Sequence, residues 1–177
     1  PNISSGMIPV VYDYGKEAFV KADTSNWYNY NNKEWANIVL VSDAVRDSYN
    51  SALEGTPILE SDVLAYYVWI PRYRYQIFYD GVNATSKQLI NIKFESKETS
   101  KSLGTAKTEW LTHPAFTFGA SELDGIWVGK FEITGSTTTP TIKPNQTSLR
   151  NLNVSSLFNV SKKINYGTIR DTSMIKN

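Results

Sequence analysis

The sequence predicts an α+β fold with mainly antiparallel, twisted sheets, two or three short helices and long loops. Short apolar runs alternate with turn-forming residues, and few segments carry helical spacing. The 177 residues are 41% hydrophobic and 13% aromatic, which suffices for one hydrophobic core. We therefore expect a single domain over residues 1–177, with an N-terminal β subregion at 1–41 and an exposed loop at 95–107.

Strand signals dominate the N-terminal subregion. Residues 7–12 are apolar, and a second short apolar run at 18–22 follows a Tyr-Gly turn signal. These two runs are expected to pair as a hairpin. Aromatic residues flank an Asn-Asn turn within residues 27–35, which predicts a second hairpin that leads into a buried strand at 38–41.

Two segments have the spacing of amphipathic helices. The first begins at Ser42 or Asp43, either of which can act as the N-cap, and runs to about Leu53. The second covers residues 154–164, and Asn153 is its candidate cap.

The middle of the chain alternates in the manner of a half-buried sheet. Apolar residues occupy the odd positions of residues 73–79, and a similar alternation returns at residues 88–94. The even positions of this part are polar and predict a solvent-facing side: Arg72, Arg74 and Gln76. The loop at 95–107 is mostly Lys, Ser, Glu, Thr and Gly, so we expect it to face solvent.

Residues 125–134 are expected to form a buried strand that carries two glycines and a glutamate at positions unusual for a strand. Gly125 and Gly129 indicate positions where another backbone or a bulge comes close. Glu132 is the carboxylate of this strand, and a buried carboxylate must be paired or hydrogen-bonded. Lys130 lies two residues away on the same face and is its candidate partner.

This strand, Gly-Ile-Trp-Val-Gly-Lys-Phe-Glu-Ile-Thr, is similar to one of the formylglycine-generating-enzyme superfamily, whose fold is a variant of the C-type lectin fold. Over nearly the whole chain, the sequence also resembles a group of surface proteins from Firmicutes and their phages. Besides the strand at 125–134, the following blocks carry this resemblance: Gly6-Met-Ile-Pro-Val-Val-Tyr-Asp13, Trp27-Tyr-Asn-Tyr30, Lys33-Glu-Trp-Ala-Asn37, Val68-Trp-Ile-Pro-Arg-Tyr73 and His113-Pro-Ala-Phe-Thr-Phe-Gly119.

The resemblance implies a lectin-like scaffold that displays loops from a rigid base. In the related surface proteins, a block that resembles Met174-Ile-Lys-Asn177 opens the second half of the fold, so we expect this chain to lack that C-terminal half. The oxidase chemistry of the superfamily depends on a cysteine pair, and this chain contains no cysteine. The resemblance therefore does not extend to that activity.

Composition argues against several classes of function. Without cysteine, the chain has no disulfide, thiolate nucleophile or zinc-thiolate site. The 18 Lys and Arg residues nearly balance the 17 Asp and Glu residues, so we expect no nucleic-acid surface. No apolar run is long enough to span a membrane. With one histidine and scattered aspartates, no metal, cofactor or catalytic residue is predicted.

Two groups of residues carry the site predictions. The ligand-binding candidates are aromatic residues that can stack on sugar rings if exposed, although core packing is the favoured interpretation: Trp27, Tyr28, Tyr30 and Trp35. A second group is interpreted as structural: Trp69, His113, Trp127, Gly129 and Glu132.

Together, the resemblance and the weakly charged, cysteine-free composition predict a non-enzymatic attachment or structural module of a phage fibre or virion appendage. The alternative is a subunit of a bacterial pilus or pilin-like filament. Expected partners are other copies or neighbouring structural chains, with a cell-surface glycan or protein as a further candidate. The expected location is the virion surface or the bacterial cell surface. An enzyme derived from the oxidase scaffold is the weakest hypothesis, because it requires carboxylates that converge in a pocket.

Overall fold

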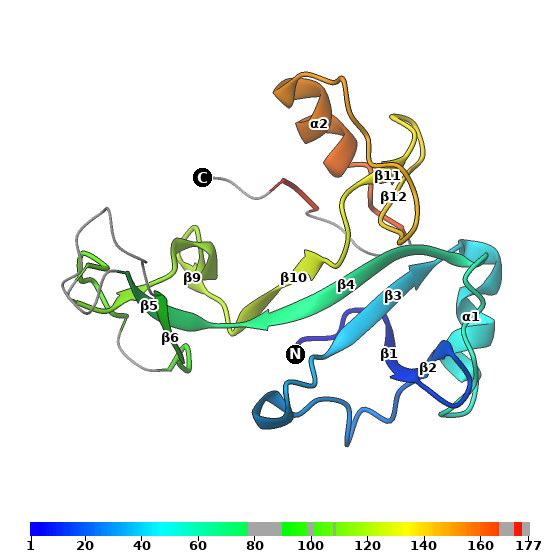
Figure 1. The fold of residues 1–177 in the computed structure, drawn as a ribbon, viewed down its shortest axis with the longest axis horizontal. Helices are drawn as coiled ribbons and strands as arrows, with labels where there is room; N and C mark the ends of the chain where they lie inside the picture. The colour runs from blue at the N-terminus through cyan, green and yellow to red at the C-terminus, as the bar shows by residue number, and fades with distance from the viewer. Residues whose placement is uncertain (78–89, 99–100, 108, 167–171, 175–177) are drawn as a thin grey trace. The chain divides into compact units, whose positions relative to one another are not determined.

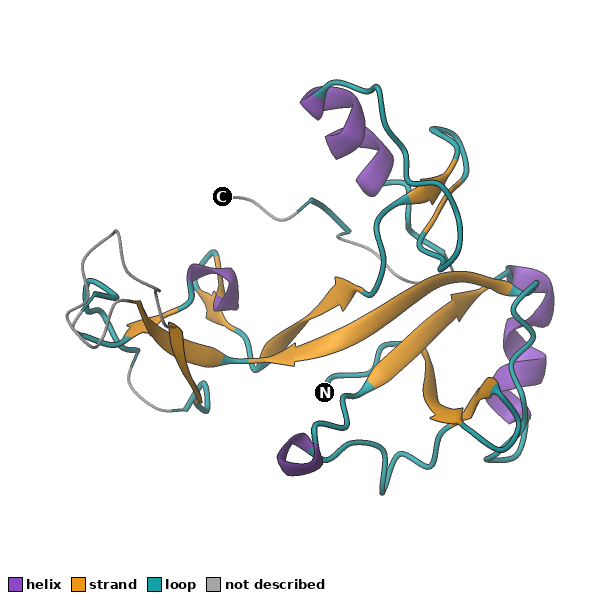
Figure 2. Ribbon diagram, in the orientation of Figure 1, coloured by secondary structure: helices purple, strands orange, loops and turns teal. Residues whose placement is uncertain are grey.

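The structure is a computed structural model that describes residues 1–77, 90–98, 101–107, 109–166 and 172–174. The described chain is mixed α+β, with mostly antiparallel sheets and two α-helices, as the sequence predicts. Figure 2 shows that strands and loops prevail over helices. The chain forms two compact units: a central unit of Pro1 and residues 69–127, and a flanking unit of residues 2–68 and 128–177.

The flanking unit is built on strands β1 to β4, which Figure 1 labels together with its helices. A five-stranded sheet has the order β10-β4-β3-β1-β2. The elements of this unit are β1 (Ile8–Asp13), β2 (Ala18–Lys21), η1 (Tyr30–Asn32), β3 (Asn37–Val41), α1 (Asp43–Ser51), β11 (Thr134–Gly135), β12 (Pro140–Thr141) and α2 (Val154–Ser161). Strands β4 (Val63–Pro71) and β10 (Gly125–Gly129) have residues in both units.

The first predicted hairpin is confirmed. Strands β1 and β2 pair antiparallel, with Val11 opposite Val20 and Tyr12 opposite Phe19. Alternation of side chains puts Ile8, Val10 and Tyr12 on one face of β1, where Ile8 and Val10 are fully buried and Tyr12, near the end of the strand, is 43% exposed.

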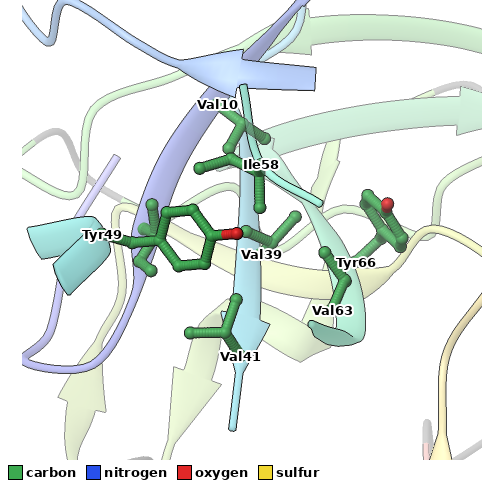
Figure 3. Packing of buried hydrophobic residues seen from close by; sticks show 8 residues of the cluster. Val10, Val39, Val41, Tyr49, Ile58, Val63 and Tyr66 are labelled. Carbon is green, nitrogen blue, oxygen red and sulfur yellow. The ribbon is translucent and has the colours of Figure 1, made fainter. Parts of the chain in front are cut away.

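The core of the flanking unit is apolar and lies on this sheet. Figure 3 shows part of it, with the ring of Tyr49 pointing from α1 toward Val39 on β3. The phenol of Tyr49 donates to Asp62 Oδ2 at 2.6 Å and so satisfies its polar group within the core. The buried cluster consists of Ile8, Val10, Val39, Val41, Tyr49, Ile58, Val63 and Tyr66.

Both predicted helices are present. Ser42 takes the N-cap position of α1 without a side-chain cap bond, and the helix ends before Leu53, which is 83% exposed. Helix α2 is capped as predicted, because Asn153 Oδ1 accepts from the backbone N–H of Ser156 at 2.8 Å. Across the described residues, no helix has the length and apolar character that a membrane crossing requires.

The second predicted hairpin, at residues 27–35, is wrong. The Asn-Asn segment forms the short helix η1 instead of a two-residue turn, and only one bridge, between Asn29 and Glu34, joins its two sides. The reason is local: the side chain of Asn29 accepts from the backbone N–H groups of Asn31 and Asn32 and so stabilises a helical turn.

The central unit contains a three-stranded sheet in the order β6-β5-β7. Tyr75 of β5 lies opposite Ile92 on one side and Leu111 on the other. The elements of this unit are β5 (Tyr73–Ile77), β6 (Ile90–Phe94), β7 (Leu111–Thr112), η2 (Pro114–Phe116), β8 (Thr117–Phe118) and β9 (Ser121–Glu122). The predicted strand positions 78–79 and 88–89, the loop positions 99–100 and the terminal residues 175–177 lie outside the described residues.

The predicted solvent-facing position of Arg72 is wrong. The side chain is 1% exposed, and its Nε and Nη1 atoms contact Glu95 and Glu122 at 2.9 and 2.6 Å. The loop at 95–107 is therefore not wholly solvent-facing, since the side chain of Glu95 is only 6% exposed and Ala106 is also buried. The alternation rule failed because the two carboxylates offset the cost of burying the guanidinium.

The strand expected at 125–134 is shorter than predicted, because β10 ends at Gly129. The close approach expected at Gly125 is confirmed: a Cβ there would lie 2.5 Å from both the carbonyl oxygen of Ile70 and the ring of Trp69. At Gly129 the nearest atom would be Cδ1 of Ile142, at 3.1 Å. Only the first glycine thus leaves no room for a side chain.

Candidate functional site

An open groove of about 620 Å³ lies in the flanking unit. Three stretches line it: the turn and strands of the β1–β2 hairpin, residues 57–60, and residues 143–146. The aromatic ring of Tyr66, from β4, lies at its base beside the core. We refer to this feature as the hairpin groove.

Backbone pairing fixes two of these stretches. The N–H of Ile58 donates to the carbonyl of Phe19 at 2.9 Å, so residues 57–60 run along β2. On the other side, Ile142 exchanges backbone hydrogen bonds with Leu64 and Tyr66 of β4, at 2.9 and 3.0 Å. Backbone hydrogen bonds therefore anchor two of the stretches that line the groove to strands β2 and β4.

A chain of aromatic rings forms the apolar wall of the hairpin groove. The rings of Tyr12 and Phe19 meet edge to face at a centroid distance of 5.3 Å, and Phe19 lies 5.2 Å from Tyr66. Tyr14 extends the chain beyond the groove, 5.0 Å from Tyr12. Because Tyr12 is 43% exposed, part of this wall is open to a ligand.

A carboxylate and an amine that line the groove are held together. Glu60 accepts a hydrogen bond from the phenol of Tyr66, and Lys143 Nζ donates to the Glu60 carbonyl at 2.7 Å. The Lys143 amine also lies 3.6 Å from Glu60 Oε1. Burial, followed by the hydrogen bond to Glu60, raises the pKa of Tyr66 well above its ordinary value.

The rim carries polar side chains with freedom to bind. Glu17, Asn145 and Gln146 are exposed, and their side chains make no hydrogen bond to any described residue. Glu17 and Asn145 have φ angles of 51° and 55°, in the left-handed region that non-glycine residues seldom adopt. Backbone of this kind often occurs where side chains are positioned for a function.

The structure divides the predicted ligand-binding aromatics. Trp27 is 5% exposed and donates its indole N–H to the carbonyl of Val10 at 3.2 Å, so it is a core residue. Tyr28 and Trp35 are each 40% exposed, and both contact the ring of Tyr30, at 5.0 and 5.2 Å. Desolvation, with a smaller effect of Tyr28, raises the pKa of Tyr30 to about 12. These three rings form a small patch that is separate from the residues of the hairpin groove.

The residues predicted to be structural lie in packed or capping positions, with one exception. Trp69 and Trp127 meet edge to face at 5.1 Å. His113 caps η2, with Nδ1 accepting from the backbone N–H of Ala115 at 3.1 Å, and burial lowers its pKa. Glu132, by contrast, is exposed and lies after the end of β10.

Lys130 is not paired with Glu132 as expected. Its Nζ donates to Asn37 Oδ1 at 2.7 Å and lies 5.3 Å from the centroid of the Phe19 ring. Although the residue as a whole is exposed, desolvation of the amine lowers its pKa. The predicted contact failed because β10 stops before the two residues can share a strand face.

The central unit holds a polar cluster around Arg72. Thr112 Oγ1 donates to Glu95 at 2.8 Å, and Thr117 Oγ1 donates to Glu122 at the same distance. Lys101 Nζ completes the cluster, 3.4 Å from Glu122 Oε1. Because each acidic group is already bound by protein donors, we interpret this cluster as structural rather than catalytic.

Sequence reasoning did not find the hairpin groove. Tyr12 and Phe19 lie in runs that were interpreted only as strands, and Glu60, Tyr66 and Gln146 lie in segments to which no site was assigned. One signal in the sequence could have indicated the groove. Tyr12 and Phe19 lie directly opposite each other in the predicted hairpin, so they form a cross-strand aromatic pair.

Among the described residues, no group of three or more His, Asp or Glu side chains is placed to hold a metal ion. Comparison with family models, curated proteins and solved structures found no match for this chain.

Proposed function

We propose that this chain is a non-enzymatic attachment module on a surface structure and that the hairpin groove holds its target. The setting that we propose is a phage fibre or virion appendage with a lectin-like scaffold; a bacterial pilus or pilin-like filament is the alternative. The observation that carries the proposal is the exposed ring of Tyr12 beside rim side chains that no described residue engages. Such a combination of apolar surface and a few free polar groups is typical of ligand sites.

The carboxylates of the groove favour binding over catalysis. Hydrolysis of a glycosidic bond requires two carboxyl groups, one of them as the acid that protonates the leaving group. Glu60 is held by Tyr66 and Lys143, and Glu17 lies on an exposed turn. Neither is placed in the desolvated environment that prepares a general acid.

The change Tyr12→Ser tests the attachment function. Loss of the exposed ring is expected to reduce binding of the labelled chain to intact Gram-positive cells by about tenfold, since an aromatic contact of this kind is worth on the order of 1 kcal/mol or more. Cosedimentation with a panel of Firmicutes cells measures this. The matched control is Tyr14→Ser, a change at an 87% exposed tyrosine of the same hairpin that does not line the groove.

Equal binding by the Tyr12→Ser and Tyr14→Ser variants would contradict the assignment of the groove. A wild-type chain that sediments with none of the cells would contradict the attachment function itself. Thermal unfolding of each variant serves as a folding control.

Strand β6 favours a second function, assembly with another copy of the chain. Among the described strands β6 pairs with β5 alone, and Ile90, Ile92 and Phe94 are 64%, 57% and 50% exposed. If two copies of β6 pair antiparallel about Ile92, Ile90 of one copy faces Phe94 of the other. On the opposite face, Lys93 then lies across from Asn91 and not from a second lysine. Two copies of β6 can therefore pair in this register without opposing like charges.

The change Ile92→Lys tests this assembly. It places two like charges at the centre of the proposed strand pair, so the wild-type chain is expected to be dimeric and the variant monomeric. Sedimentation velocity measures the oligomeric state. Leu103→Lys is the control, because Leu103 is 79% exposed and lies outside β6. A monomeric wild-type chain would rule out the assembly.

A further inference from the structure

From the chemistry of the hairpin groove we infer its ligand class: a short saccharide that is neutral or carries an amino group, and not an acidic one. This inference rests on the proposed attachment function and names what the groove recognises. Three properties of the groove support it: its rings, its polar rim and its charge.

The aromatic wall matches one face of a sugar ring. A pyranose presents a patch of C–H bonds on one face, and the face of an aromatic ring carries negative charge density that attracts them. Tyr12 is 43% exposed, and its ring is held against the groove wall by an edge-to-face contact with Phe19. A ring fixed in this way loses little freedom when the ligand binds.

The rim matches the hydroxyl groups around the sugar. Each hydroxyl both donates and accepts, and the amides of Asn145 and Gln146 do the same. The carboxylate of Glu17 adds an acceptor on the hairpin side of the groove. A peptide in extended form would instead require a row of unpaired backbone groups, and the backbone at Phe19 and Ile58 is already paired across the two stretches.

The charge of the groove excludes acidic sugars. Among the described residues that line it, the carboxylates are Glu17 and Glu60 and the one cation is Lys143. That amine already binds both the carbonyl and the carboxylate of Glu60, at 2.7 and 3.6 Å. A ligand carboxylate or phosphate would therefore meet like charges without a free cation, which disfavours binding.

The size of the groove fits an oligosaccharide. Its volume of about 620 Å³ lies inside the range of about 300–1,000 Å³ that is usual for small-ligand sites. The groove is open to solvent, so a chain end or an internal segment of a longer glycan can enter it.

A saccharide panel tests the inference. The labelled chain is applied to immobilised neutral, N-acetylated, amino and acidic oligosaccharides, and affinities for the positive members are measured by titration calorimetry. We expect binding to neutral or amino members and to none of the acidic ones. Tyr12→Ser and Gln146→Ala should each weaken binding by about tenfold or more. Tyr14→Ser and Thr147→Ala, at exposed positions outside the groove, should leave it unchanged.

Three results would overturn the inference: binding to any acidic member, equal affinity of the Tyr12→Ser and wild-type chains for the saccharide, or no binding to any member. A cell-binding experiment distinguishes a wrong saccharide class from a wrong attachment function. If protease treatment of the cells abolishes a Tyr12-dependent attachment and soluble saccharides do not compete with it, the target is a protein. In that case the attachment function stands and the saccharide class is wrong.

Discussion

The two compact units of this chain bury different kinds of side chain. In the flanking unit, the interior of the sheet is filled by aliphatic residues such as Ile8, Val39 and Val63, each of which is at most 1% exposed. In the central unit, the largest fully buried side chain is Arg72, which carries a charge. The first kind of interior forms by burial of apolar area, and the second requires directed contacts among charged groups.

This difference has consequences for how each unit tolerates change. An apolar core loses stability roughly in proportion to the volume removed and can relax around the gap. A buried ion cluster gives little net stability when it is intact, but removal of one member leaves its partner charged and without compensation. A single substitution in the buried ion cluster of the central unit should therefore cost more stability than one in the apolar core of the flanking unit.

Arg72→Ala is expected to cause the largest loss of stability. Without the guanidinium, the Glu95 side chain, which is only 6% exposed, keeps the hydroxyl of Thr112 as its remaining partner. The expected loss is about 3–5 kcal/mol. Hydrogen exchange measured by mass spectrometry should show it as lost protection in residues of the central unit.

A matched control for this change is Arg74→Ala, two residues along the same chain segment. Arg74 lies 5.3 Å from the ring centroid of Trp110, so its removal should cost only about 0.5–1 kcal/mol. Equal effects of the two changes would show that the Arg72 cluster is not specially sensitive. Adding Glu95→Ala to Arg72→Ala should recover part of the loss, because the uncompensated carboxylate is then absent.

Ile8→Ala is the counterpart in the flanking unit and is expected to have the next largest effect. Ile8 is fully buried and lies opposite Val39 in the β1–β3 pair, so the change leaves a cavity that costs about 2–5 kcal/mol. Denaturant unfolding of the variant measures it. Ile3→Ala, at a residue that is 44% exposed, should change stability by less than about 0.5 kcal/mol. Similar losses in both variants would argue against an apolar core at Ile8.

The same difference explains how much of the fold could be predicted. The β1–β2 hairpin and the two helices follow from local signals, namely apolar spacing, a turn and the cap at Asn153. The Arg72 cluster could not be predicted, because its members come from positions 72, 95 and 122, and nothing local marks them as partners. Alternation predicted burial at Ile8 and Val10, but it failed at Arg72 and in β6, where Ile90, Ile92 and Phe94 are exposed.

The candidate site shows the same limit. Sequence reasoning selected aromatic residues by their density at 27–35, but exposure separates core residues from binding residues, and exposure depends on tertiary packing. Trp27 therefore lies in the core, whereas Tyr12 is exposed beside a groove that also needs Glu60 and Gln146. Residues from three separate stretches meet there, and no spacing within one stretch encodes that meeting.

Acid should also weaken the central unit, with the smallest of the three effects. The hydrogen bond from Arg72, followed by that from Thr117, holds the pKa of Glu122 below its ordinary value of 4.5. A carboxyl group whose pKa is lower in the folded state stabilises the fold at pH values above the ordinary pKa, and this contribution is lost as the pH falls through the folded value. Protection of the central unit from hydrogen exchange should therefore begin to decline below about pH 4.5.

Two variants test whether Glu122 causes this decline. In Glu122→Gln the decline should be shallower, because the titrating group is absent. Glu54→Gln, at an exposed residue of the flanking unit, should leave the profile of the central unit unchanged. An acid profile for Glu122→Gln that is as steep as that of the wild-type chain would show that other carboxyl groups govern the acid response.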